Sequence, residues 1–225
     1  MRVVIVILLS VSIAFALQIQ QNAYNKNLQT QSWIEFRDKD ILKQQMDFTC
    51  GTGSLGTVLK YFYNKEVSEQ ELMTKVLKLK GIDPEKAKSM EYQDEKMGFS
   101  FYDLSEVSKE YGFKAVGLAV DFKTLEQLNI PVIVYIKVRK YEHFTVFKKM
   151  DEKYVYLADP SYGNIQVRHS RFRNMFETTE AKLKGKLLAI IPLDKSIETN
   201  GDFRIYKNSF DVDKIVDEHR FEQLN

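Results

Sequence analysis

Hydrophobic residues in the first half of the chain recur at helical spacing. Four of them fall at positions i, i+3, i+4 and i+7, which places them on one helical face: Leu55, Val58, Leu59 and Phe62. The helix that they predict begins just after Cys50. Ser68, with a glutamate three residues later, has the capping-box pattern of a second helix that ends near Gly81. Ser100 opens a third helix, which Gly112 ends, so helices precede any strong strand.

The second half of the chain has the pattern of strands. Short segments rich in Val, Ile, Phe and Tyr cover residues 115–120, 131–138, 143–149, 154–158, 164–167 and 187–192. Turn residues at 151–153 and 159–163 would join neighbouring antiparallel strands. Helices followed by an antiparallel sheet predict an α+β fold, with the N-terminal helices packed on the sheet.

The first sixteen residues have the parts of a secretory signal peptide: a basic start, an apolar run from Val3 to Ile13, and Ala14 and Ala16 before the cleavage point. The run is shorter than the roughly 20 apolar residues that a membrane span needs, although an uncleaved anchor is the alternative. A lipoprotein would need a cysteine at the cleavage site, and the only cysteine lies far downstream. We therefore expect an exported protein, periplasmic or secreted, that starts at Leu17 and has no integral membrane association after cleavage.

Length and composition indicate one ordinary globular domain. The chain has 225 residues, of which 44% are hydrophobic and 28% charged, which is enough to bury a substantial core. We expect a lead-in segment over 17–40, a central domain over 41–193 and a charged C-terminal extension over 194–225. No internal repeat or second domain is evident in the sequence.

The charge balance excludes one class of partner. A formal net charge of +2 provides no basic excess for counterion release from a duplex, so we expect no nucleic-acid partner. The three histidines are scattered at positions 143, 169 and 219 and make no recognisable zinc site, so we expect neither a metal nor a cofactor.

The single cysteine, Cys50, has no partner for an intramolecular disulfide, and in an exported protein such a thiol is either buried or used. It stands immediately before the first predicted helix, where the helix N-terminus favours a thiolate. Gly51 and Gly53 leave the backbone beside it uncrowded for an approaching substrate carbonyl. The alternative is a small buried hydrophobe, which is what most lone cysteines are. The glycines favour a nucleophile.

His143 opens one predicted strand and Asp159 ends the next, so the two lie on opposite arms of a hairpin. A carboxylate at Asp159 would orient His143 through its second ring nitrogen and complete a nucleophile, base and orienter with Cys50. Alternatively, His143 is an exposed surface residue and Asp159 belongs to an ordinary turn. A side-chain amide upstream of the cysteine would donate to the oxyanion, and Gln44 and Gln45 serve that role equally well on spacing alone.

Four motifs resemble, in order and spacing, the bacteriocin-processing cysteine peptidases of the papain-like superfamily. They are the segments Gln44 to Leu55, Gly98 to Leu104, His143 to Val146 and Ala158 to Gly163, within a match that runs from about Ile41 to about Pro192. The resemblance implies a papain-like peptidase domain over 41–193 with a catalytic site of Cys50, His143 and Asp159. It also implies that Gln44, rather than Gln45, is the oxyanion donor.

Two features set this chain apart from the best-known members, which are domains of exporters that cut leader peptides after Gly-Gly. It begins with a signal peptide, and Thr49 and Gly53 stand where those members usually have Asp and Ala. We therefore expect a stand-alone exported peptidase that needs no Gly-Gly leader and accepts extended segments of exported or cell-surface protein. Acyl transfer on the same triad and a non-catalytic peptide-binding assembly module are the alternative functions.

Overall fold

The computed structural model describes residues 32–87, 98–177, 184–204 and 210–211. The predicted signal peptide, residues 1–16, and most of the lead-in segment lie outside these described residues. None of the helices in the described ranges is long and apolar enough to cross a membrane.

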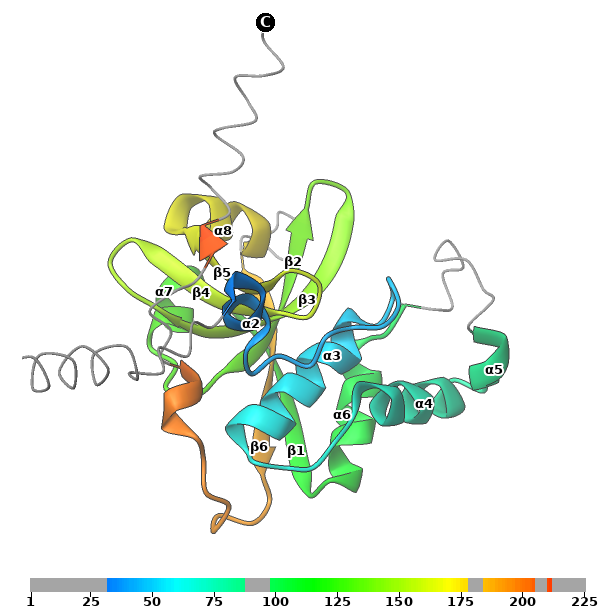
Figure 1. Cartoon of the computed structure of the whole chain (residues 1–225). Coiled ribbons are helices and arrows are strands. Elements are labelled where there is room, and N and C mark those ends of the chain that lie inside the picture. Colours follow the sequence, from blue (N-terminus) through cyan, green and yellow to red (C-terminus); the bar gives the residue numbers. More distant parts are fainter. Residues whose placement is uncertain (1–31, 88–97, 178–183, 205–209, 212–225) are drawn as a thin grey trace, which may run out of the picture. The chain divides into compact units, whose positions relative to one another are not determined.

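The helices are α2 (Trp33–Asp38), α3 (Cys50–Thr57), α4 (Glu69–Leu79), α5 (Pro84–Ala87), α6 (Phe101–Glu110), α7 (Phe122–Glu126) and α8 (His169–Phe176), with a π-helical turn η1 (Val58–Phe62) and a 3-10 turn η4 (Gly201–Arg204). The strands are β1 (Phe113–Val120), β2 (Val132–Val138), β3 (Tyr141–Met150), β4 (Tyr154–Asp159), β5 (Gly163–Arg168), β6 (Gly185–Pro192) and β7 (Phe210–Asp211). Figure 1 shows their arrangement.

Within the described residues the strands form one sheet in the order β1-β6-β2-β3-β4-β5-β7. All neighbours are antiparallel except β5 and β7, which pair in parallel. The predicted α+β fold is confirmed, and each of the six predicted strands is present within about two residues. The patterns did not reveal α7, α8 or β7, because these elements are too short for a clear period.

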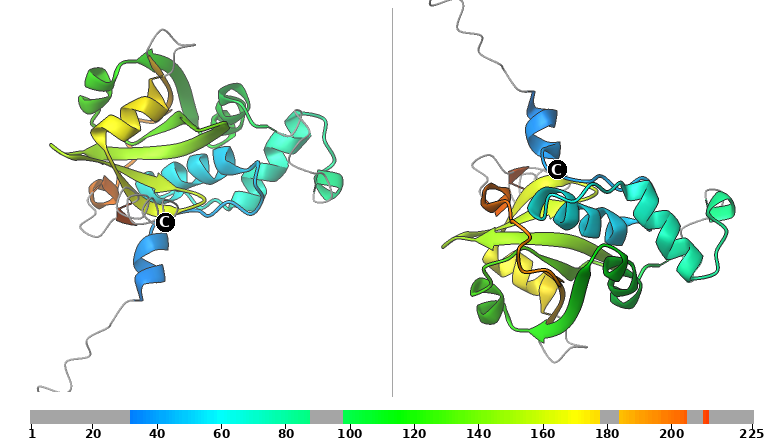
Figure 2. Two further views of the ribbon diagram at one scale, coloured as in Figure 1. Left: turned by 90° about the horizontal axis from the view of Figure 1, so that it is seen from above. Right: turned by 90° about the horizontal axis from the view of Figure 1, so that it is seen from below.

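Helices cover both faces of the sheet, with α3, α4 and α6 on one face and α7 and α8 on the other (Figure 2). Alternate side chains of β2 therefore enter two cores: Ile133 faces the α3 side, while Val132 and Val134 face the α8 side. Burial on both faces explains why β2 reads as a continuous apolar run rather than an alternating one.

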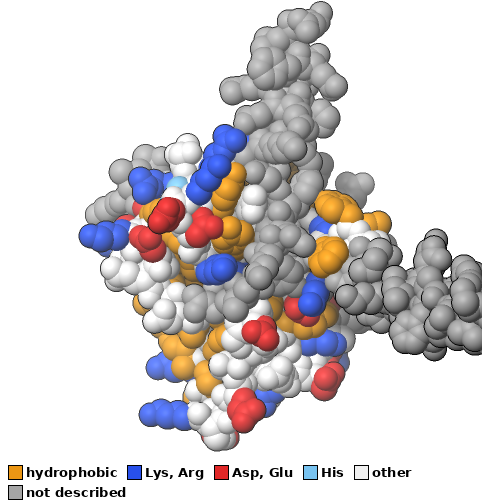
Figure 3. Space-filling model, turned by 60° about the vertical axis from the view of Figure 1, so that its left-hand side comes forward, with side chains coloured by type: hydrophobic (Ala, Val, Ile, Leu, Met, Phe, Trp, Pro, Cys, Tyr) orange, Lys and Arg blue, Asp and Glu red, His pale blue; other side chains and the backbone are white. Residues whose placement is uncertain are grey.

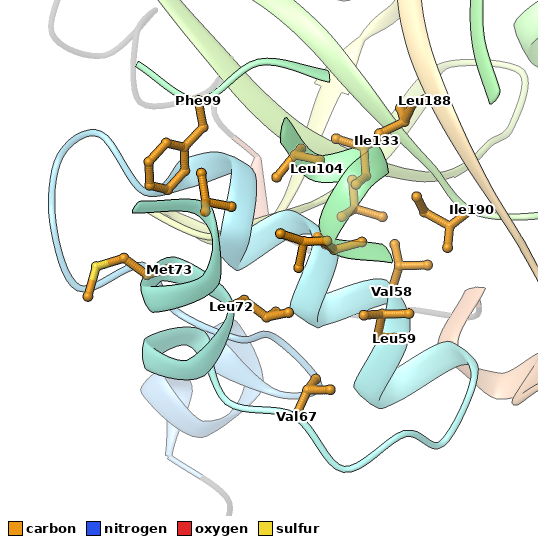
Figure 4. Close-up of a cluster of buried hydrophobic side chains, with 14 of the residues drawn as sticks. Val58, Leu59, Val67, Leu72, Met73, Phe99, Leu104, Ile133, Leu188 and Ile190 are labelled. Carbon is orange, nitrogen blue, oxygen red and sulfur yellow. The ribbon is translucent and has the colours of Figure 1, made fainter. Parts of the chain in front are cut away.

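The larger core lies between the first face and the helices that begin after residue 49. Leu55, Val58 and Leu59 are fully buried there, which confirms the helical face predicted from their spacing. Leu72 of α4 and Leu104 of α6 pack against them (Figure 4). The last turn of this helix is wider than predicted, because the backbone N–H of residue 63 bonds the carbonyl five residues earlier.

The predicted helix boundaries follow from side-chain caps. Ser68 accepts a hydrogen bond from the Glu71 N–H, and α4 begins at the next residue. Ser100 and Asp103 form a complete capping box at the start of α6. Gly112 follows α6 with a φ of 82°, a conformation that a glycine adopts without strain.

The segment after residue 193 also contributes to the core. Phe203 of η4 is fully buried, and its ring centroid lies 6.3 Å from that of Phe62. A bulge in β3 between residues 147 and 149 accompanies the burial of Lys148, whose Nζ lies 4.5 Å from the Phe203 ring centroid. Burial lowers the pKa of Lys148 to about 6. The strand pattern did not indicate that this lysine is buried.

Candidate active site

Cys50 is the first residue of α3 and is only 9% exposed. Thr49, the residue before it, does not cap the helix with its side chain, because its hydroxyl donates to the Met46 carbonyl at 3.0 Å instead. The first N–H groups of α3 therefore stay available near the sulfur, where the helix dipole favours a negative charge. The predicted position of Cys50 at a helix N-terminus is confirmed.

His143 lies on β3, whose hairpin with β2 reaches two residues further than predicted. The strand begins at Tyr141, and His143 pairs with Ile136 of β2. The prediction that His143 occupies the first strand position is therefore wrong, because the β2–β3 hairpin extends past it. The imidazole is consequently held within a paired strand.

The structure brings His143 and Asp159 together. The His143 Nε2 lies 2.8 Å from the Asp159 Oδ2, and the carboxylate is almost completely buried. The Asp159 Oδ1 accepts hydrogen bonds from the backbone N–H groups of Ser161 and Tyr162, both at 2.9 Å. The two bonds to Oδ1 fix the carboxylate relative to the turn after β4. The ring nitrogen that remains for Cys50 is Nδ1.

The charges of His143 and Asp159 stabilise each other in the site. Burial by itself would lower the pKa of His143, but hydrogen bonds and charge interactions with Asp159 and Cys50 outweigh it and raise that pKa to about 10. Burial would raise the pKa of Asp159, yet the imidazole and the backbone N–H groups hold it below its ordinary value. The site therefore favours an imidazolium paired with the Asp159 carboxylate.

Gln44 is fixed against the same turn. Its backbone N–H donates to the Pro160 carbonyl at 3.1 Å, and its Oε1 accepts from the Ser161 hydroxyl at 2.6 Å. Its Nε2 donates to the Met46 carbonyl at 3.0 Å, in the loop that leads to Cys50. These bonds determine which end of the amide is the donor, and they hold the amide against the loop that leads to Cys50.

The two glycines in the first turn of α3, Gly51 and Gly53, do not have the same surroundings. A Cβ at Gly51 would make only ordinary contacts at 3.4 Å. A Cβ at Gly53 would lie 2.6 Å from the Pro160 Cβ and 3.1 Å from the Leu42 carbonyl oxygen. The expectation that Gly53 leaves room for substrate is wrong, because this glycine lets the Asp159–Pro160 turn pack directly on α3.

Glu69 is a residue near the site that the sequence did not reveal. It is the first residue of α4, only 3% exposed, and its Oε1 accepts from the Thr52 hydroxyl of α3 at 3.0 Å. Burial raises the pKa of Glu69, and hydrogen bonds from Thr49 and Thr52 oppose that shift only in part. A glutamate in the first turn of a helix is ordinarily solvated, so no local signal distinguished it.

A cleft of about 330 Å³ adjoins Gln44 and His143. Its lining includes Gln44, His143, Ser161 and Tyr162. The face of the molecule shown in Figure 3 mixes acidic, basic and hydrophobic side chains over its described part, without a continuous region of one charge. Among the described residues, no cluster of three His, Cys, Asp or Glu side chains forms a metal site.

A cysteine at the start of a buried helix and a strand histidine held by a carboxylate, on this α+β fold, define the papain-like class of cysteine peptidases. Residues 38–183 match the model of the Peptidase C39 family. The chain belongs to this family and is a cysteine-type peptidase. The resemblance to bacteriocin-processing peptidases predicted from the four motifs is confirmed.

Two curated relatives come from Pseudomonas. The chain is 35% identical over 136 residues to the probable functional amyloid protease FapD of Pseudomonas aeruginosa, a match that covers 60% of this chain and 56% of the relative. It is 29% identical over 138 residues to the protein of the same description from Pseudomonas fluorescens, covering 61% and 57%. The chain thus spans somewhat more than half the length of these relatives.

Two solved structures share the fold. One is a double glycine motif protease from an AMS/PCAT transporter in complex with the leader peptide, with a TM-score of 0.50, 21% identity, and coverage of 68% of this chain and 90% of that chain. The other is the peptidase domain of Streptococcus ComA, a bi-functional ABC transporter, with a TM-score of 0.50, 20% identity, and coverage of 68% and 97%. At this identity the likeness establishes the papain-like fold.

Proposed function

We propose that this peptidase hydrolyses peptide bonds with Cys50 as nucleophile, His143 as general base and acid, Asp159 as the orienting carboxylate and Gln44 as an oxyanion donor. The single observation that carries this assignment is the 2.8 Å contact between His143 and Asp159, with the imidazole also interacting with Cys50 at the start of α3. This is the arrangement of nucleophile, base and orienter that covalent catalysis requires.

The chemistry follows from these positions. The Cys50 thiolate attacks the substrate carbonyl carbon, and the oxyanion accepts hydrogen bonds from the Cys50 backbone N–H and from the second Nε2 proton of Gln44. His143 then gives its proton to the departing amine as the carbon–nitrogen bond breaks, leaving a thioester on Cys50. Water, deprotonated by His143, attacks the thioester and releases the carboxylic acid together with the thiolate.

We propose that the protein is exported, with residues 1–16 removed as a signal peptide, and acts in the periplasm or as a secreted enzyme. The mature chain then comprises a lead-in segment over 17–40, the peptidase domain over 41–193 and a charged extension over 194–225. N-terminal sequencing of exported material should give Leu17 as the first residue. Intact Met1 in a membrane fraction would identify an uncleaved anchor instead.

The substrate that we propose is an extended segment of an exported polypeptide. We expect cleavage without Gly-Gly before the scissile bond, because that motif belongs to the substrate of a transporter-borne protease, whereas we propose an exported protein with a signal peptide. The Pseudomonas relatives are described as probable functional amyloid proteases, so an exported amyloid-forming polypeptide is the substrate class to test first.

The proposed function is tested by cleavage of a proteome-derived peptide library with the purified protein and its Cys50→Ala variant. We expect products only with the unaltered protein, at sites that do not all follow Gly-Gly. Cleavage confined to Gly-Gly sites would contradict the proposed specificity. Peptides joined to added amines, in place of free acids, would identify acyl transfer, and binding without either product would identify a peptide-binding module.

A further inference from the structure

A second cavity, of about 600 Å³, adjoins the candidate catalytic site on the α8 side of the sheet. His143 and Asp159 line it at one end. Its apolar walls come from α2, β2, β5 and α8, and consist of Trp33, Ile136, Val138, Ile165, Val167 and Met175. A concave apolar space of this size next to reactive groups is typical of a binding site.

The cavity continues the catalytic cleft. The two spaces share Val138, His143, Ser161 and Tyr162 in their linings, and Cys50 is not part of either lining. Both therefore lie on the imidazole side of the site. Because the imidazole donates the proton to the departing amine, the segment of substrate that leaves with this amine occupies the same side.

Cations at the mouth of the cavity have partners within the protein. The Arg37 guanidinium lies 2.6 Å from the Asp38 carboxylate, and the Lys43 Nζ lies 3.4 Å from the same group. Lys43 also donates to the Ser161 carbonyl at 2.7 Å. Asp38 balances one of these two charges, and Arg171 also lies in the lining. The occupant that we expect is apolar because of the extent of the apolar walls, and the binding test below includes an acidic peptide for comparison.

The helix α2, which forms one wall of the cavity, is held against β5 by hydrogen bonds at its C-terminal end. The Asn164 Nδ2 at the start of β5 donates to the Arg37 carbonyl at 3.1 Å and to the Lys39 carbonyl at 2.8 Å, where α2 ends. Gly163 lies so close that a Cβ there would be 2.6 Å from the Arg37 carbonyl oxygen. Trp33 thus belongs to the built site, although it precedes the region that matches the family, which begins at residue 38.

We propose that this cavity is a specificity pocket for a large aliphatic or aromatic side chain in the substrate segment that leaves with the amine. The inference rests on the proposed function, because it assigns the leaving segment to the imidazole side. Trp33 of α2 supplies one wall from outside the family match, while the walls from β2, β5 and α8 lie within it.

Binding tests the pocket separately from catalysis. Peptides that represent the leaving segment, with Leu, Phe, Glu or Gly at each of the first four positions, are titrated against the Cys50→Ala variant. We expect Leu or Phe at one position to tighten binding by at least about tenfold over Gly, as burial of a large side chain in a preformed pocket provides. Equal binding of the Leu, Phe and Gly peptides would overturn the pocket, and so would tightest binding of the Glu peptide.

The matched variants are neighbours on α2. Trp33→Ala removes an apolar wall and should reduce the preference for Leu or Phe over Gly by about fivefold to tenfold. Ile34→Ala alters a side chain that is 58% exposed and outside the lining, and should leave the preference unchanged. Equal effects of the two would contradict the assignment of Trp33. Apolar preference in binding without any cleavage by the unaltered protein would overturn the proposed function while the pocket stands.

Discussion

The Asp159 carboxylate is held by His143 on one oxygen and by its own turn on the other. Its Oδ2 lies 2.8 Å from the His143 Nε2, and its Oδ1 accepts two backbone N–H bonds from the residues that follow Pro160. These three bonds stabilise the buried anion, and the imidazole is its counter-ion. The turn therefore fixes the imidazole that faces Cys50.

Substitutions of the triad should separate its roles. Removal of the base blocks formation of the nucleophile, so His143→Ala should be as inactive as Cys50→Ala. Asp159→Asn keeps the size of the side chain but removes its charge, and should give an intermediate loss in kcat. Steady-state kinetics on one cleaved peptide measures all three. A fully active Asp159→Asn variant would remove Asp159 from the mechanism.

Gln44→Ala should lower kcat by about two to three orders of magnitude, the usual loss for one oxyanion donor. The effect on KM should be small, because the oxyanion exists only in the transition state. Gln45→Ala is the matched control, since it changes the neighbouring amide. A severe defect in Gln45→Ala with a normal Gln44→Ala variant would show that the wrong glutamine was assigned.

Stability should depend on pH through the histidine and aspartate pair. The pKa of His143 is raised from 6.5 to about 10, so its contribution is fully present below 6.5 and is lost as pH rises through about 10. The pKa of Asp159 is lowered from 3.8, so its contribution is present above 3.8 and is lost as pH falls below it. Urea unfolding should therefore show the largest difference in unfolding free energy between the unaltered protein and Asp159→Asn between pH 3.8 and pH 6.5. A difference in unfolding free energy that increases toward pH 10 would contradict this prediction, because the contribution of His143 is lost in that range.

Glu69 should matter as a buried hydrogen-bonding group that contacts the cysteine helix, where burial raises its pKa. Glu69→Gln retains an acceptor for Thr52 and should remain close to the unaltered protein in stability. Glu69→Leu leaves the buried Thr52 hydroxyl with the Thr49 carbonyl as its remaining acceptor, and should cost about 0.5 to 1.5 kcal/mol of unfolding free energy. Alkylation of Cys50 by iodoacetamide should also slow in this variant. Gln70→Leu, at the exposed neighbouring position, is the control for Glu69→Leu, and an equal loss of unfolding free energy in the two variants would refute the assignment.

Gly163→Ala and Gly112→Ala form a matched pair, because both glycines have positive φ. At Gly112 a Cβ meets nothing within 4 Å, so only the conformational penalty of about 1 kcal/mol applies. At Gly163 a Cβ would also overlap the Arg37 carbonyl, which should add about 1 to 3 kcal/mol. Denaturant unfolding compares the two, and a smaller loss for Gly163→Ala would mean that α2 is not packed on this turn.

Several features of the protein follow from short stretches of sequence. The helix that begins at Cys50 depends on apolar spacing, those that begin at Glu69 and Phe101 depend also on caps within four residues, and the strand pattern depends on neighbouring residues alone. The position of Cys50 at a helix N-terminus is local in the same sense. These interactions form between groups close along the chain, so a pattern in the sequence is enough to predict them.

Other features were decided only by tertiary packing. The close contact of Gly53 with Pro160, the buried Glu69 beneath α3 and the wall that Trp33 gives to the larger cavity each join segments far apart in the sequence. Lys148 is buried because β3 bulges against the segment that carries Phe203, although lysine ordinarily stays in solvent. Such neighbours have no fixed spacing, because their approach is determined by how whole elements pack. The sequence by itself therefore determined the longer helices and the strands β1 to β6 and indicated the candidate reactive residues, and the packing of the elements decided which groups surround them.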